Sequence, residues 1–408
     1  MKLDPASEQM KYLTTRQALA DIPYFAKNFS RENFSDVDLT PQGTPWIMLG
    51  ESYPGMRSAL SRNEYPDTIF AAYASSAIVQ ARVDLSSYYE QVYRGMLANG
   101  FGACVKDLQA AMRHIDDQLS RNDTAAAIKQ RFLGPGAERN QNDDFAKAIG
   151  YVYSEFQSDG MNGNLKGFCE HLKADTDTNR TSNSDGLALI YGSQYVTERF
   201  ASWPGLAHYV NAYQHTNCKG LNETEPLSCK LSKQNTNPDA QAWIWQYCTE
   251  WGFFESNNIG PHTLLSKYLT LEYEQSVCNH NFPSALKSGA LPPRPQADTF
   301  NAEFGGWTIR PSNVYWSAGQ WDPWRPLTPL STEGFAPKDV NFTTEVPACG
   351  VQTGEDTLFG YIIENAEHGF DLTPTVMDST SIQASQNHFR RALRGWLPCF
   401  KSKSSGSG

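Results

Sequence analysis

The chain lacks most features that would direct it to a membrane, a nucleic acid or a metal. Its 408 residues hold no apolar run near the roughly 20 residues that a membrane-spanning helix needs. The net charge is −10, and Lys and Arg form no basic stripe, which argues against a polyanion-binding surface. The His-x-x-x-His and His-Glu-x-x-His patterns of zinc hydrolases are also missing. We therefore predict no membrane span, no nucleic-acid partner, no metal and no cofactor.

Residues 1–8 also lack the apolar segment that a secretory signal peptide contains, so we do not expect one at this position. Two other features are nevertheless typical of a secreted protein. The chain has eight cysteines, and an even number without a metal-site pattern favours disulfides in an oxidising compartment. It also has six Asn-X-Ser/Thr sequons. The predicted glycosylation sites are Asn28, Asn33, Asn122, Asn179, Asn222 and Asn341. We expect a secreted or a vacuolar or lysosomal protein, with the disulfide pairing left open.

Three short segments carry a serine, an aspartate and a histidine, each directly after an apolar run that is typical of a strand. Ser52 lies in Gly-Glu-Ser-Tyr-Pro-Gly, Asp322 in Gly-Gln-Trp-Asp-Pro-Trp, and His368 in Glu-Asn-Ala-Glu-His-Gly. Serine, aspartate, histidine is the chain order of an α/β-hydrolase triad, and it differs from the orders in chymotrypsin-like and subtilisin-like enzymes. Because each segment follows a strand, we expect the three side chains to meet at one rim of a parallel sheet.

Each of these residues has a simpler interpretation when it is taken alone. Gly-x-Ser also occurs in strand-ending turns, Asp-Pro often begins a turn, and a histidine in a loop is often a surface residue. The strict nucleophile turn also has Gly two residues after the serine, where this chain has Pro54 followed by Gly55. The shared order and placement of the segments favour a triad. In it Ser52 is the nucleophile, His368 carries the proton, and Asp322 orients the imidazole.

The hydrophobic pattern predicts an α/β-hydrolase core that is interrupted by a helical insertion. Apolar runs at residues 46–49 and 69–74 read as buried parallel strands, and strand character returns at 314–317 and 358–363. In residues 84–300, apolar residues recur mainly at helical spacing, and six of the eight cysteines lie in this range. The predicted domains are residues 1–83 as the nucleophile part of the core, 84–300 as a mainly helical cap, 301–400 as the acid and base part, and 401–408 as a disordered tail.

The segments around these residues resemble the peptidase S28 family. The nucleophile segment and the later Ala74-Ser75-Ser76-Ala77 are similar to that family's nucleophile region. Asp322-Pro323-Trp324 and Ala366-Glu367-His368 are similar to its acid and base segments. The family includes lysosomal Pro-X carboxypeptidase, dipeptidyl peptidase II and secreted fungal relatives, and this chain is most similar to the fungal branch. It departs from the family at Glu51, where glycine is expected.

This resemblance implies a serine exopeptidase that cleaves proline-containing peptides after proline, often at acidic pH. The acyl-enzyme would form on Ser52, and the backbone N–H of Tyr53 would be the first oxyanion donor. The resemblance does not distinguish carboxypeptidase from aminodipeptidase action. Two other functions stay open, namely a catalytically inactive secreted binding protein on the same fold and an esterase. The oligomeric state is not indicated.

The part of the chain before the nucleophile is short for this fold. Only 51 residues precede Ser52, and they contain one predicted helix and no strand before residue 46. An α/β-hydrolase places several strands there, together with the loop that supplies a second oxyanion donor. We therefore expect an N-terminally incomplete chain, arising from a truncated gene model, a processed fragment or a diverged paralogue, in which activity is impaired. The missing signal peptide agrees with this expectation.

Overall fold

The computed structural model describes residues 8–175, 180–232, 234–258, 260–374 and 379–401. The chain divides into two compact units. The first consists of Met1–Val83, Ala242–Phe253 and Ser284–Gly408, and the second consists of Asp84–Gln241 and Phe254–Pro283. The predicted tail lies outside the described residues except for Lys401.

The first unit is built on a five-stranded sheet in the order β1-β2-β7-β9-β8, and all of its paired strands are parallel. The strands are β1 (Trp46–Glu51), β2 (Ile69–Ser75), β7 (Val314–Gly319), β9 (Thr357–Ile363) and β8 (Asn341–Thr343). Apolar residues fill both faces of the central strands, as expected for a parallel sheet that is covered on both sides. The prediction of an α/β-hydrolase fold is confirmed.

The register of the sheet brings the ends of four strands to one rim. Glu51 at the end of β1 pairs with Ser75 at the end of β2, and Ser75 pairs with Ser317 near the end of β7. Gly319 at the end of β7 pairs with Ile363 at the end of β9. Since the strands are parallel, the loops that follow them begin at the same edge. The three predicted site segments therefore start at the same rim, with β2 between β1 and β7.

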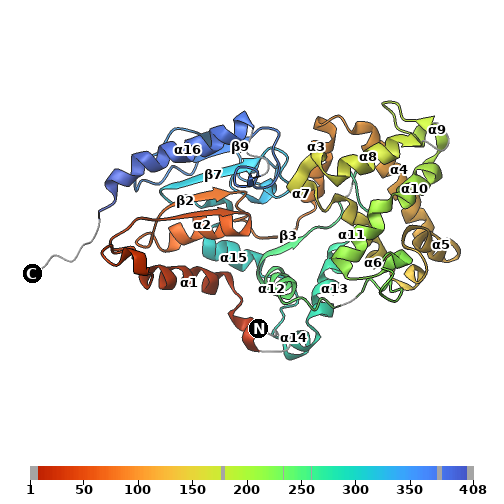
Figure 1. Cartoon of the computed structure of the whole chain (residues 1–408), viewed down its shortest axis with the longest axis horizontal. Helices are drawn as coiled ribbons and strands as arrows, with labels where there is room; N and C mark the ends of the chain where they lie inside the picture. Colours follow the sequence, from red (N-terminus) through yellow and green to blue (C-terminus); the bar gives the residue numbers. More distant parts are fainter. Residues whose placement is uncertain (1–7, 176–179, 233, 259, 375–378, 402–408) are drawn as a thin grey trace, which may run out of the picture. The chain divides into compact units, whose positions relative to one another are not determined.

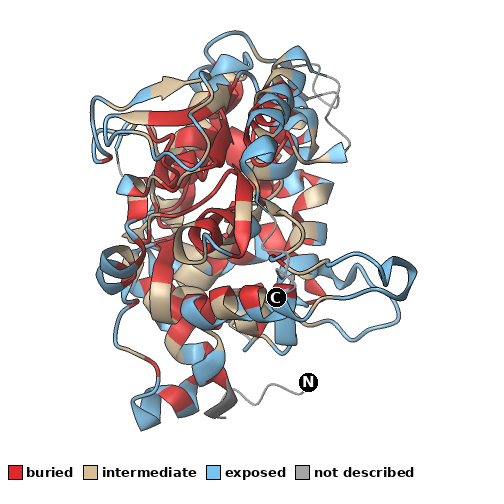
Figure 2. Cartoon of the chain, turned by 90° about the vertical axis from the view of Figure 1, so that its left-hand side faces the viewer, coloured by how far each residue is buried: buried red, intermediate tan, exposed pale blue. Residues whose placement is uncertain are grey.

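Helices cover the two faces of this sheet (Figure 1). On one face, α16 (Thr380–Trp396) packs Phe389, Ala392 and Trp396 against Tyr73 and Tyr315 of the central strands. On the other face lies α2 (Tyr53–Glu64), which contacts β1 and β2, with α1 (Thr15–Lys27) and α15 (Ala297–Phe304) nearby. The buried residues are concentrated on the strands and on the inner sides of these helices (Figure 2).

Strand β1 forms the edge of the sheet, and the described residues before it contain no strand. Its outer side is open, since Leu49 is 54% exposed. Tyr24 and Phe25 of α1 are also largely exposed. The core is therefore less completely covered beside the nucleophile strand than at β2 and β7.

The segment Ala242–Phe253 belongs to the first unit, although it lies within the range 84–300 that the sequence predicts as cap. Its Glu250 carboxylate accepts hydrogen bonds from the backbone N–H of Thr15, at 2.9 Å, and from the Thr15 hydroxyl, at 2.7 Å. The indole N–H of Trp251 donates to the same hydroxyl. A carboxylate at the start of α1 satisfies an N–H that has no acceptor within the helix and favours the helix dipole.

The second unit is mainly helical, as the pattern of residues from Asp84 onward predicts. Its helices are α3 (Ser87–Ala98), α4 (Gly102–Leu119), α5 (Asn122–Leu133), α6 (Asn142–Gly150), α7 (Phe156–Asp159), α8 (Asn164–Lys173), α9 (Ala188–Tyr191), α10 (Ser193–Ser202), α11 (Pro204–Gln214) and α13 (Leu271–Asn281). Two helices run across the unit boundaries, α12 (Pro238–Gln246) and α14 (Pro283–Ser288). Two pairs of short strands lie outside the five-stranded sheet. They are β3 (Arg82–Asp84) with β6 (Gly252–Phe254), mostly in the first unit, and β4 (Ala174–Asp175) with β5 (Arg180–Thr181) in the second.

The predicted disulfides are confirmed. Cys104 bonds to Cys169 and Cys218 to Cys229 in the second unit, and Cys349 bonds to Cys399 in the first. Cys248 and Cys278 are also disulfide-bonded. Of the sequon asparagines, Asn179 lies outside the described residues, and the other five are exposed. Exposure is required for glycosylation, which stays a prediction.

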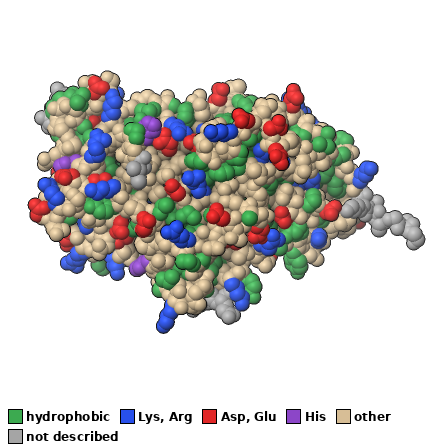
Figure 3. Space-filling model, turned by 180° about the vertical axis from the view of Figure 1, so that it is seen from behind, with side chains coloured by type: hydrophobic (Ala, Val, Ile, Leu, Met, Phe, Trp, Pro, Cys, Tyr) green, Lys and Arg blue, Asp and Glu red, His purple; other side chains and the backbone are tan. Residues whose placement is uncertain are grey.

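Two surface properties can be compared with the sequence. Among the described helices, none is long and apolar enough to cross a bilayer. On the face seen in Figure 3, acidic and basic side chains are interspersed, and the basic ones do not gather into one patch.

Candidate functional site

Ser52 lies in the sharp turn between β1 and α2. Its backbone has φ 61° and ψ −126°, which is strained for a residue with a side chain. The turn is held by a hydrogen bond of 3.0 Å from the Ser52 N–H to the carbonyl oxygen of Ser75 on β2. Strain of this kind occurs where a nucleophile must stand clear of the sheet.

The departure from the strict turn pattern has a structural explanation. Pro54 lies in the first turn of α2, where a missing N–H costs nothing. Gly55 makes the close approach instead, because a Cβ at this position would collide with the carbonyl oxygen of Ser75. The glycine that the strict pattern places at position 54 is therefore needed at position 55 in this chain. With Gly55, helix α2 packs closely against β2.

The backbone N–H of Tyr53 lies at the start of helix α2, directly after Ser52. Tyr53 is the first residue of α2, so its N–H has no acceptor within the helix and lies at the positive end of the helix dipole. It also directly follows Ser52, where a carbonyl oxygen of an attacked substrate would acquire charge. In the described structure we identify no second donor for that oxygen.

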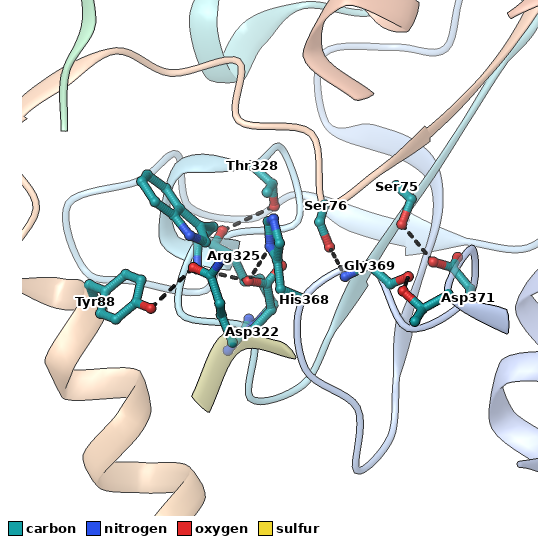
Figure 4. A network of polar contacts seen from close by, with 12 residues as sticks. Ser75, Ser76, Tyr88, Asp322, Arg325, Thr328, His368, Gly369 and Asp371 are labelled. Carbon is teal, nitrogen blue, oxygen red and sulfur yellow. Dashed lines mark hydrogen bonds and ion pairs between the residues drawn. The ribbon is translucent and has the colours of Figure 1, made fainter. Parts of the chain in front are cut away.

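Asp322 and His368 are brought together as predicted. One carboxylate oxygen of Asp322 lies 2.8 Å from Nδ1 of His368 (Figure 4). A carboxylate only accepts, so Nδ1 carries the hydrogen and Nε2 has the free lone pair of a base. Asp322 is fully buried and His368 is 6% exposed. The pair thus has the geometry of an imidazole that is held in one orientation by a carboxylate.

The charges around His368 set its protonation. Burial lowers the pKa of the imidazole, but the Asp322 carboxylate beside it, with smaller contributions from Glu51 and Asp371, raises it by more. The net direction of the His368 pKa is upward from its ordinary value of 6.5. The imidazolium that forms when the base accepts a proton is therefore stabilised.

The loops that carry Asp322 and His368 are joined by backbone hydrogen bonds. The N–H of Trp321 donates to the carbonyl oxygen of Ala366 at 2.9 Å, and that of Gln320 donates to Ile363 at 2.9 Å. Within the acid loop, the Trp324 N–H donates to the Asp322 carboxylate at 2.8 Å. These contacts fix the distance between the acid and the base.

Ser52 is not hydrogen-bonded to the imidazole in this structure. Nε2 of His368 is buried and has no hydrogen-bond partner among the described residues. The two segments are nevertheless neighbours, because the side chain of Glu51 packs directly against Gly369. Catalytic hydrogen bonds are often unformed in enzymes without substrate and form when substrate binds. The structure thus joins Asp322 and His368, and it brings the residue before Ser52 against the residue after His368.

Asp371 is a buried residue to which the sequence assigned no role. Its carboxylate accepts hydrogen bonds from the hydroxyls of Tyr73, of Ser75 at 2.5 Å and of Ser385 at 3.0 Å. Its backbone oxygen accepts from Gln386 at 2.8 Å. These contacts tie the loop after His368 to β2 and α16.

Aromatic rings form a wall from the nucleophile turn to the base. The ring centroids of Tyr53 and Trp251 lie 5.1 Å apart, and Trp251 and Phe253 lie 5.7 Å apart. The wall continues from Phe253 to Trp324 at 5.5 Å and from Trp324 to His368 at 6.3 Å. Phe253 has φ 58°, so its backbone is strained. Trp251 is fully buried, and it packs against Tyr53, the residue after Ser52.

The described residues contain no cluster of His, Cys, Asp and Glu side chains that could hold a metal ion. Two pairs of described histidines and acids lie within contact distance, His368 with Asp322 and His262 with Glu90. Only the first of these lies at the rim of the sheet.

Comparison with known proteins gives a family match. The model of the family described as Serine carboxypeptidase S28 matches residues 3–336. The matched range includes Ser52 and Asp322 and ends before His368.

Several curated proteins are similar to the chain. The mouse thymus-specific serine protease is 26% identical over 97% of this chain and 71% of its own length. A protein of Arthroderma benhamiae named "Probable extracellular serine carboxypeptidase" is 25% identical over 79% of this chain and 46% of its own length. The serine protease vicPb of Bipolaris victoriae is 22% identical over 78% of this chain and 61% of its own length. The chain thus spans about half the length of the Arthroderma relative.

Proposed function

Because the chain belongs to the serine carboxypeptidase S28 family, we propose that it is a serine peptidase with Ser52, Asp322 and His368 as its triad. The observation that carries the proposal is the buried pair of Asp322 and His368, whose free Nε2 lies at the same rim as the strained turn of Ser52. A buried imidazole without a partner at Nε2 costs stability, and a role as base explains why it is there.

The proposed reaction has two halves. Ser52 Oγ attacks the substrate carbonyl carbon while Nε2 of His368 takes the hydroxyl proton, and the Tyr53 N–H stabilises the carbonyl oxygen as it becomes negative. Nε2 then gives this proton to the leaving nitrogen, the peptide C–N bond breaks, and an ester forms on Ser52. In the second half water replaces the leaving group, so the ester is hydrolysed and the serine is restored.

We infer that the substrate is a proline-containing peptide and that cleavage follows proline near a chain end. The partly exposed ring of Tyr53, next to Ser52, supports this, since a proline ring is compact and apolar and packs well against aromatic faces. Exopeptidase action agrees with the carboxypeptidase names in the family, which describe the relatives and not this chain.

We also infer that the protein passes through an oxidising compartment, either secreted or vacuolar or lysosomal. The disulfides and the exposed sequon asparagines support this location. One relative is named extracellular.

Two alternatives keep some support. An inactive binding protein is favoured by the missing hydrogen bond between Ser52 and His368 and by a single identified oxyanion donor. An esterase would use the same three residues. Release of product from a p-nitrophenyl ester, with none from a proline-containing peptide, would favour the esterase.

Labelling with a fluorophosphonate tests the proposal. This probe reacts with an activated serine, so the folded protein should be labelled at Ser52 and Ser52→Ala should not react. Ser58→Ala is the matched control, because Ser58 lies on the same helix and its hydroxyl bonds to the carbonyl oxygen of Pro54. Equal labelling of Ser52→Ala, or no labelling of folded wild-type protein, would contradict the proposed function.

A further inference from the structure

Glu51 directly precedes the nucleophile and faces the base. Its side chain is half-buried and packs against Gly369, the residue after His368. The carboxyl group occupies the space into which a Cβ at position 369 would project, and Gly369 has φ +66°. Glycine at 369 therefore makes room for Glu51. The family resemblance leads one to expect glycine at position 51, so this carboxyl is a feature of this chain.

The Glu51 carboxyl has charged neighbours but accepts no hydrogen bond from them. His368 and Asp371 face it from the loop after β9, and Asp322 faces it from the loop after β7. On β2 its register partner is Ser75, which is uncharged. A half-buried carboxyl next to Ser52, for which no hydrogen-bond donor is found among the described residues, is available to a ligand.

These surroundings favour the neutral carboxyl. Burial raises the pKa of Glu51, the imidazole of His368 lowers it, and the carboxylates of Asp371 and Asp322 raise it, with an upward net direction from 4.5. Glu51 thus keeps its proton at a higher pH than an exposed glutamate does. In this form it has an O–H group that can donate a hydrogen bond.

The position of Glu51 relative to His368 indicates which part of a substrate it meets. In the proposed reaction Nε2 of His368 must reach the leaving nitrogen, so the leaving group lies beside the loop that carries His368. Glu51 packs against that same loop. When the last residue of a peptide is the leaving group, its carboxylate is attached to the carbon that bears the leaving nitrogen. That carboxylate would therefore come close to Glu51.

We propose that Glu51 selects peptides whose scissile bond is the last one, by donating a hydrogen bond from its protonated carboxyl to the free α-carboxylate of the leaving residue. This inference rests on the proposed function and makes the chain a carboxypeptidase rather than an aminodipeptidase. The contact is a charge-assisted O–H···O⁻ hydrogen bond. The bound carboxylate itself favours the protonated form of Glu51, so the two groups share one proton.

A pH dependence follows from this contact. As the pH rises through the pKa of Glu51 in the complex, two carboxylates face each other and the free acid is repelled. A substrate that ends in a neutral amide is not repelled. The preference for free acid over amide should therefore be present at acidic pH and disappear towards neutral pH.

Binding to the Ser52→Ala protein tests this without catalysis. The probes are an N-acyl-Pro-Phe dipeptide and its C-terminal amide, with dissociation constants measured by calorimetry from about pH 4 to about pH 8, which spans the range of a raised glutamate pKa. At acidic pH the free acid should bind roughly ten- to a hundredfold more tightly than the amide, the range of a charged hydrogen bond. This ratio should fall as the pH rises.

Substitutions at position 51 identify the source of the preference. In the Ser52→Ala protein, the further substitution Glu51→Gln keeps a hydrogen-bond donor that does not titrate. The preference for the free acid over the amide should therefore persist at neutral pH. Adding Glu51→Gly should abolish it at every pH. Glu364→Gln is the matched control, because Glu364 is an exposed carboxylate at the start of the segment that carries His368, and it should leave the ratio unchanged.

Several outcomes would overturn the inference. These are equal affinities for acid and amide at acidic pH, a ratio that Glu51→Gln and Glu51→Gly do not change, or no binding of either probe. Fluorophosphonate labelling of the wild-type protein is measured in parallel. Labelling at Ser52 together with any of these outcomes removes only the role of Glu51, whereas absent labelling removes the proposed function.

Discussion

Two buried aspartates, Asp322 and Asp371, lie at the same rim of the sheet and differ in what they bind. Both are fully buried. The Asp371 carboxylate accepts from three hydroxyls. Asp322 uses one oxygen for His368 and for the Trp324 N–H, and its other oxygen has no partner within the part of the chain that the structure describes. The Asp371 carboxylate, whose donors are all hydroxyls of β2 and α16, holds the loop after His368 in place. A carboxylate that is bonded to an imidazole can stabilise a positive charge that appears during a reaction.

The comparison predicts that replacing Asp371 and replacing Asp322 have different effects on the protein. Asp371 connects β2, α16 and the loop after His368, so its loss should weaken the fold. Asp322 holds only its own loop and the imidazole, so its loss should affect the chemistry first.

The largest expected effect is on the rate after Asp322→Asn. Asparagine keeps the size of the side chain but no longer stabilises the imidazolium, so kcat/KM on a proline-containing peptide should fall by about 10³- to 10⁴-fold. Denaturant unfolding should show that the free energy of unfolding changes by less than about 1 kcal/mol. An active Asp322→Asn protein would remove the difference between the two aspartates.

The second-largest expected effect is the loss of stability that Asp371→Ala causes. Its loss leaves the hydroxyls of Tyr73, Ser75 and Ser385 buried without their acceptor. The free energy of unfolding should fall by about 2–4 kcal/mol, measured by denaturant titration. A stability like that of the wild type would show that these hydrogen bonds do not hold the loop.

A third prediction concerns pH. The raised pKa of His368 places the acidic limb of kcat/KM above pH 6.5 for an amidated substrate, because only neutral imidazole accepts the serine proton. Below that limb the rate should fall about tenfold for each pH unit. Glu51→Gln removes a carboxylate that stabilises the imidazolium, so the limb should move to lower pH. A pH profile that Glu51→Gln leaves in place would show that Glu51 does not influence the base.

The smallest expected effect is that of Ser76→Ala. The Ser76 hydroxyl accepts a hydrogen bond of 2.9 Å from the Gly369 N–H, beside the base. Its loss should lower the free energy of unfolding by about 0.5–1.5 kcal/mol, with a modest loss of rate. A loss as large as that of Asp371→Ala would mean that the loop depends on this one bond.

The sequence predicted the sheet and the positions of the site segments, because buried parallel strands read as apolar runs and the loops after them begin at one rim. It could not predict what Glu51 and Asp371 contact. Glu51 meets Gly369, more than 300 positions away along the chain, and the acceptor role of Asp371 depends on hydroxyls from β2 and α16. Nothing in the local pattern encodes these distant contacts.

The placement of residues 242–253 shows the same limit. Their aromatic side chains are compatible with either unit, and local spacing does not reveal which partner buries them. The structure assigns this segment to the core, where Trp251 packs against Tyr53. The sequence pattern assigned the segment to the cap, whereas its packing places it in the core.

The central claim is that Ser52, Asp322 and His368 act together. A crystal structure of the protein inactivated by a phosphonate tests it most directly, because the adduct mimics the tetrahedral state of the reaction. The account predicts phosphorus bonded to Ser52 Oγ, with the Tyr53 N–H and Nε2 of His368 each within about 3 Å of an adduct oxygen. An adduct on another residue, or an imidazole that stays out of reach of the bound group, would contradict it.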